Sequence, residues 1–102
     1  MIRINEYKQL ILEHRFYEAH EVLEEFWFPR RRKKDELSLI IKGFINAAVA
    51  FELKKRGRLT NANKVWQTYI KFMALLDKVP NRELLELKEF IDNFAKKFLF
   101  EN

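Results

Sequence analysis

The chain contains no cysteine, only two glycines and only two prolines. Without cysteine there is no disulfide bond, no thiolate ligand for zinc and no cysteine nucleophile. So few glycines and prolines cannot supply the turns of an all-β chain, which reverses direction roughly every ten residues. The sequence therefore predicts long helices joined by few connections.

The chain also lacks a long uninterrupted apolar run. Residues 1–8 do not contain the apolar segment of a signal peptide. The most apolar stretch, residues 37–53, is interrupted by Ser38, Lys42, Gly43 and Asn46, whereas a bilayer span needs about 20 apolar residues. We therefore expect no membrane partner and a cytoplasmic location.

What is present suits one globular domain. The 102 residues are 48% hydrophobic and 15% aromatic, which is enough apolar material for a core, and we expect a single domain over residues 1–102. The net charge of +5 makes polyanions conceivable partners. However, 34% charged residues of both signs also describe an ordinary soluble helical surface.

Apolar residues at helical spacing predict an all-α bundle of about five helices. Asn5 is the expected N-cap of the first helix, and a break is expected near His14 and Arg15. Pro29 ends the second helix, because the residue before a proline is pushed out of helical geometry.

The third helix, about residues 36–56, is apolar on nearly all sides and should be central. Asp35 is its expected cap and Gly57 its expected end. On the side of this helix that carries Gly43 the residues are small and should let a neighbouring helix approach closely. We expect this neighbour to be the second helix.

The fourth helix should begin at a cap on Thr60 or Asn61. A break at residues 78–80 leads to the fifth helix. Short connections make consecutive helices antiparallel neighbours, so the third, fourth and fifth helices should form an up-down bundle with the first two packed across it.

One polar pair interrupts the apolar stripe of the second helix. Phe16, Ala19 and Leu23 form a core-facing stripe at helical spacing, and His20 falls inside this stripe. Glu24 follows one turn after His20, close enough for a ring N–H to approach its carboxylate.

The pair has three interpretations. As a binding or interaction module, the protein would use a polar locus of His20, Glu24, Trp27 and Asn46. As a hydrolase-like enzyme, it would use His20 as the base and Glu24 to orient it. In the third interpretation His20 is a core histidine whose hydrogen bonds Glu24 or Asn46 satisfies. Binding is our main prediction, and whether the chain is an enzyme stays open.

No cofactor is predicted, and a divalent metal is the alternative. His20-Glu21 begins like the zinc motif H-E-x-x-H, but Glu24 occupies the position of the second histidine. His20 and Glu24 would therefore need a further ligand. The available candidates are His14, Glu52 and Asp92.

A basic run precedes the third helix, and the antiparallel order should bring two further basic residues to the same end. This basic pole comprises Arg30, Arg31, Arg32, Lys33, Lys34, Lys78 and Arg82. Weak binding of a nucleic-acid backbone is the corresponding alternative function. A homo-oligomer is also possible, because aromatic-rich small bundles often cover apolar surface with a partner.

Three stretches of the chain form a recognisable pattern: E-A-H-E-V-L-E-E-F-W at residues 18–27, K-G-F-I-N-A-A at residues 42–48, and Arg56-Gly57. In this pattern the sequence resembles the domain of unknown function 309 family. The resemblance implies a small all-helical prokaryotic domain with no assigned activity. Asn46 stands where the pattern has glutamine, Leu53 where a histidine is frequent, and Arg58 where asparagine follows the glycine. If that histidine belonged to a site, this chain lacks it.

Overall fold

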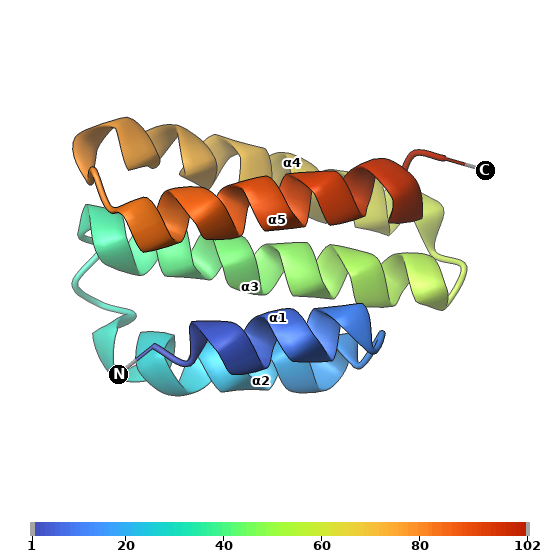
Figure 1. Ribbon diagram of the computed structural model, residues 1–102, viewed down its shortest axis with the longest axis horizontal. Helices are drawn as coiled ribbons and strands as arrows, with labels where there is room; N and C mark the ends of the chain where they lie inside the picture. The colour runs from blue at the N-terminus through green and yellow to red at the C-terminus, as the bar shows by residue number, and fades with distance from the viewer. Residues whose placement is uncertain (1, 102) are drawn as a thin grey trace.

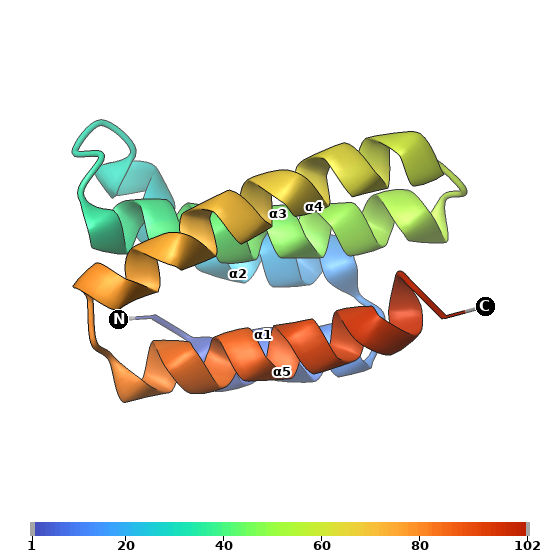
Figure 2. The same ribbon diagram turned by 90° about the horizontal axis from the view of Figure 1, so that it is seen from above.

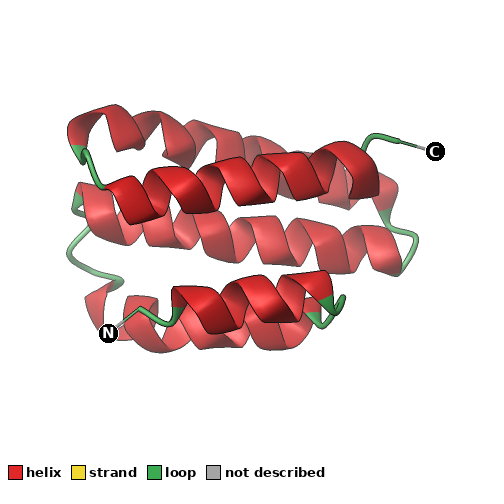
Figure 3. Ribbon diagram, viewed as in Figure 1, coloured by secondary structure: helices red, strands yellow, loops and turns green. Residues whose placement is uncertain are grey.

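The computed structural model describes residues 2–101, and these form five α-helices and two short 3-10 helices (Figures 1 and 3). The predicted all-α bundle is confirmed. The elements in chain order are α1 (Ile4–Leu12), α2 (Phe16–Trp27), η1 (Phe28–Arg30), α3 (Glu36–Lys55), α4 (Leu59–Met73), η2 (Ala74–Lys78) and α5 (Arg82–Phe98).

Each α-helix runs antiparallel to the one before it, as the short connections predict. Helices α2, α3 and α4 form one layer, and α1 and α5 run along one face of it (Figures 1 and 2). The predicted grouping of the third, fourth and fifth helices is therefore wrong. Helix α3 occupies the middle. Ile41, Phe44 and Phe51 on this helix are completely buried, which confirms the central position predicted from its apolar composition.

The connections follow the predicted turn chemistry at two places and depart from it at a third. Helix α2 ends at Trp27, close to Pro29 as expected, but the predicted reason is wrong, because Phe28 keeps helical backbone angles (φ −56°, ψ −46°) and the chain continues into η1, which contains Pro29. Asp35 caps α3, and its side chain accepts a hydrogen bond from Ser38 N at 2.8 Å. Gly57 ends α3 with a φ of +80°, a conformation that costs a residue with a Cβ about 1–2 kcal/mol.

Two predicted caps are wrong. Helix α1 begins at Ile4 with Arg3 as its N-cap, so Asn5 lies inside the first turn. Ile4 is buried, and burying such a side chain is worth more than the roughly 1 kcal/mol of a cap. Helix α4 begins at Leu59, ahead of both Thr60 and Asn61, because the bond from Arg58 N to Leu53 O reverses the chain immediately before it.

The predicted neighbour of Gly43 is also wrong. A Cβ on Gly43 would lie 2.8 Å from Met73 Cε and 3.0 Å from Phe72 Cβ, so the close approach is to α4 and not to α2. The sequence shows that one side of α3 carries small residues, but it does not show which helix packs against that side.

Within residues 2–101, no helix combines the length and the apolar composition needed to cross a membrane.

Candidate functional site

Helix α2 places His20 at the edge of the core. Phe16, Ala19 and Leu23 are buried against the rest of the bundle. His20 beside them keeps 19% of its side chain exposed, and Glu24 keeps 38%. The pair therefore lies at the border between core and solvent, where a ligand could reach it.

Both ring nitrogens of His20 have oxygen partners. Nε2 lies 2.9 Å from Glu24 Oε2, and Nδ1 lies 3.2 Å from the Tyr17 carbonyl oxygen. Both oxygens are acceptors, so whichever ring nitrogen carries a proton has an acceptor within reach. The two contacts fix the orientation of the ring.

His20 also lines a pocket between α2 and the C-terminal half of α3. Its volume is about 230 Å³. Most of its wall is apolar. The lining residues are Phe16, Tyr17, His20, Ala48, Val49, Glu52, Leu53 and Arg56.

Glu52 and Arg56 supply the second charged pair of this pocket. Arg56 Nε lies 2.6 Å from Glu52 Oε2; Glu52 is 20% exposed and Arg56 61%. The bond uses only Nε, so the terminal nitrogens of the guanidinium carry further N–H donors. Sequence reasoning considered Glu52 only as a surface residue or metal ligand and overlooked Arg56. The signal was available, because a glutamate four residues before an arginine is the favourable helical order.

Asn46 and Trp27 do not belong to this pocket. Within the described chain no hydrogen bond joins Asn46 to His20 or Glu24, and the ring nitrogens are already occupied. Of the two side chains expected to satisfy His20, the structure therefore brings Glu24 to the ring and not Asn46. Trp27 packs elsewhere, with Lys42 Nζ 4.4 Å from the centre of its ring. Both residues are only half-buried, so solvent can reach their polar atoms.

The candidate metal ligands are not brought together. His14 stacks on Phe16 at 5.3 Å between ring centroids, and Asp92 on α5 accepts hydrogen bonds from other side chains. Glu52 faces the pocket but is paired with Arg56. Among residues 2–101 no group of three or more His, Asp or Glu side chains is placed to hold a metal ion.

Several side chains of the basic pole contact neighbouring residues of the protein. The connections that carry its two parts, before α3 and before α5, lie at the same end of the bundle (Figure 1). Arg30 and Arg31 lie over the rings of Phe26 and Phe28, with the guanidinium carbon 4.3 and 3.9 Å from the ring centres. Arg82 pairs with Glu86. These contacts reduce the freedom of the pole to follow a phosphate backbone.

Comparison with known proteins gives one match. No curated protein and no solved structure matches this chain. One family model matches residues 4–65, which is more than half of the chain and includes every residue that lines the α2–α3 pocket. The chain therefore belongs to the family described as Domain of unknown function (DUF309).

Proposed function

We propose that the protein is a binding module for a small molecule and that the α2–α3 pocket is its site. The observation that carries the proposal is the convergence of His20 and the Glu52–Arg56 pair on one apolar cavity. Ligand sites usually combine an apolar wall with a few polar groups that fix orientation. This pocket has that composition.

The contacts of His20 favour binding over general base catalysis. A base needs a ring nitrogen directed at its substrate, whereas both nitrogens of His20 lie within hydrogen-bond distance of oxygen atoms of the same helix. These contacts hold the ring in one orientation. Neither ring nitrogen is directed into the pocket without a partner, so the hydrolase-like alternative has less support.

The size and charges of the pocket define the ligand class. A volume of about 230 Å³ is below the usual range for drug-sized ligands, so the ligand has only a few heavy atoms. Phe16, Val49 and Leu53 would cover an apolar body. The free guanidinium N–H groups of Arg56 match a carboxylate, which arginine binds well. The ligand class is therefore a small aliphatic acid.

The experiment is a titration of ¹⁵N-labelled protein with butyrate and hexanoate, with butylamine as the matched cation. We expect the acids, but not the amine, to shift amide resonances of α2 and of the last turns of α3. Arg56→Gln should weaken binding about tenfold or more, because a charge-assisted bond contributes about 1.5–3 kcal/mol. Arg58→Gln is the matched control, since Arg58 is exposed and does not line the pocket.

Two results would contradict the proposal. The first is the absence of any acid-specific shift in the wild-type protein. The second is an equal response of the Arg56 and Arg58 variants, which would mean that the acids respond to overall charge only. Circular dichroism spectra of both variants establish that they are folded.

A further inference from the structure

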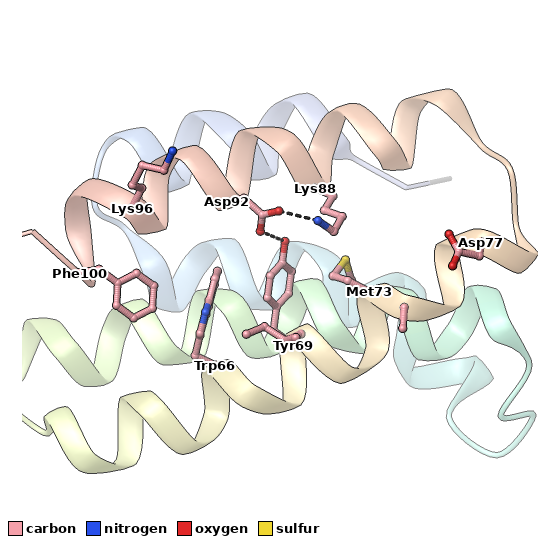
Figure 4. Close-up of a pocket in the computed structure, with 10 residues that line it drawn as sticks. Trp66, Tyr69, Met73, Asp77, Lys88, Asp92, Lys96 and Phe100 are labelled. Carbon is pink, nitrogen blue, oxygen red and sulfur yellow. Dashed lines mark hydrogen bonds and ion pairs between the residues drawn. The ribbon is translucent and has the colours of Figure 1, made fainter.

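A second concave surface lies between α4 and α5 and shares no residue with the α2–α3 pocket (Figure 4). This α4–α5 groove has a volume of about 600 Å³. Its floor consists of the buried side chains of Trp66, Tyr69 and Met73. The rings of Trp66 and Tyr69 stack at 4.4 Å between centroids, so the floor is a rigid aromatic surface.

The charges at the centre of the groove are satisfied. Asp92 accepts a hydrogen bond from the Tyr69 hydroxyl at 2.8 Å and another from Lys88 Nζ at 2.7 Å. Burial raises the pKa of Tyr69, as does the nearby negative charge of Asp92, so the hydroxyl remains a donor. The middle of the groove is therefore close to neutral.

The two ends of the groove carry opposite charges. Asp77 lies at one end and Lys96 at the other (Figure 4). Across residues 2–101, no salt bridge within 4.0 Å involves either of them. The groove thus presents one unpaired anion and one unpaired cation, separated by an apolar, neutral stretch.

The apolar side chains also differ between the two ends of the groove. Phe100, at the Lys96 end, is 57% exposed, and its ring contacts the edge of Trp66. Ala74, towards the Asp77 end, is exposed and small. Ile70 is 47% exposed and lies between them on α4. One end therefore offers a large apolar side chain, and the other end leaves room for one.

We propose that the occupant of the α4–α5 groove is a second copy of this chain, related by a two-fold axis that passes through the middle of the groove. Such an axis makes every contact occur twice. It places Lys96 of each copy against Asp77 of the other and Phe100 of each copy over Ala74 of the other. Ile70 meets its own symmetry mate near the axis. A polyanion or a membrane surface would instead suit a groove of uniform positive charge, which this groove does not have.

The test measures association by sedimentation velocity. The wild-type protein should form dimers. Asp77→Lys and Lys96→Asp should each weaken dimerisation by about tenfold or more, because each variant turns both ion pairs of the dimer into repulsive pairs. An equimolar mixture of the two variants should recover the dimer, since the mixed dimer regains both opposite-charge pairs. The doubly substituted chain should also recover it.

The controls separate this interface from a change in net charge. Lys97→Asp makes the same charge change as Lys96→Asp at an exposed neighbour outside the groove, and it should leave dimerisation unchanged. Phe100→Ser should weaken the dimer without unfolding the protein. A wild-type protein that stays monomeric at millimolar concentration overturns the proposal and leaves the groove to another kind of molecule. If the wild type is dimeric but the mixture of the two charge variants stays monomeric, the groove is not the dimer interface.

Discussion

Asp35 is a single residue on which the start of α3 depends. Its carboxylate accepts the Ser38 N–H at 2.8 Å. The nearby Ser38 hydroxyl and this N–H hold the pKa of Asp35 below its usual value. Bonds of this kind stabilise the ionised form, so the cap is strongest when Asp35 is charged.

This arrangement predicts a pH-dependent contribution to stability. A depressed pKa in the folded state stabilises the protein above the unfolded-state pKa of about 3.9, and the contribution is lost as the pH falls through the folded-state value. Asp35→Asn keeps a capping side chain but has no charge to lose. Melting temperatures should be measured from pH 7 to pH 2. The wild type should melt at a higher temperature than Asp35→Asn at neutral pH, and the difference should vanish in acid. A difference that stays constant over this pH range would contradict the prediction.

Single residues also show where sequence reasoning stops. The His20–Glu24 contact follows from helical spacing, and the structure contains it. The sequence did not predict the Tyr17 carbonyl as the second partner of His20, because every residue carries a backbone carbonyl. Arg56 was overlooked since its position at a helix end resembles ordinary surface, and only the neighbouring helix makes it part of a pocket. Sites built from two elements require the packing of those elements to be known.

At the scale of elements, the closest approach of two helices depends on Gly43. The space that a Cβ would need is occupied by Met73 Cε and Phe72 Cβ, at 2.8 and 3.0 Å. The first atom ends a flexible side chain and can move, but the second is fixed to the backbone of α4. Helices α3 and α4 must separate if residue 43 gains a side chain.

We therefore expect Gly43→Ala to destabilise the protein by about 1 kcal/mol. Alanine gains about 1 kcal/mol of helix propensity over glycine, while overpacking costs about 1–3 kcal/mol. Urea unfolding measures the change. In a Met73→Ala background the cost of Gly43→Ala should become smaller, because one of the two obstacles is gone. An increase in stability on Gly43→Ala alone would show that α3 and α4 are less closely packed.

Element boundaries were predictable where a residue imposes the backbone conformation. Asp35 and Gly57 mark both ends of α3 as expected. Asn81 caps α5 by accepting a bond from Leu84 N, although sequence reasoning did not single it out. Asn5 and Thr60 failed as caps because the start of each helix there is set by burial or by the preceding turn. A capping residue type permits a helix start but does not compel one.

At the scale of the whole molecule, Phe51 joins four helices. Its ring centroid lies 5.5 Å from that of Phe16 on α2, 5.8 Å from Trp66 on α4, and 5.0 and 5.8 Å from Phe94 and Phe98 on α5. The side chain is fully buried on α3. Loss of this ring therefore affects the contact of every layer with the central helix.

Phe51→Ala should lower the free energy of unfolding by about 3–5 kcal/mol, the usual cost of removing a buried aromatic ring. Phe51→Leu retains most of the apolar volume and should cost markedly less. Denaturant curves monitored by tryptophan fluorescence and by circular dichroism should shift together, because the four helices share one core. A loss below about 1 kcal/mol for Phe51→Ala would contradict this account.

Part of the arrangement of the bundle was predictable. Short connections impose an antiparallel order, and the apolar circumference of α3 places it in the middle. The grouping of the helices was not predictable, because the length of a connection does not show which helices share a layer, and α2 rather than α5 lies in the layer of α3 and α4. The pairing of Gly43 with α4 was not predictable, because both α2 and α4 carry large side chains that suit a small surface. The α4–α5 groove could not be foreseen either, since its depth depends on how far two helices diverge.

Two adjacent lysines at the end of α3 hold neighbouring segments against this helix. Lys54 Nζ donates to the Phe98 carbonyl at 3.0 Å, and Lys55 Nζ donates to the His14 carbonyl at 2.9 Å. Carbonyls at helix ends lack partners within their own helix, so these ammonium groups fasten the last turn of α5 and the α1–α2 connection to α3. Acylation of both lysines would therefore remove the two contacts at once. A fluorophore is better attached through an introduced cysteine at the opposite end of the bundle.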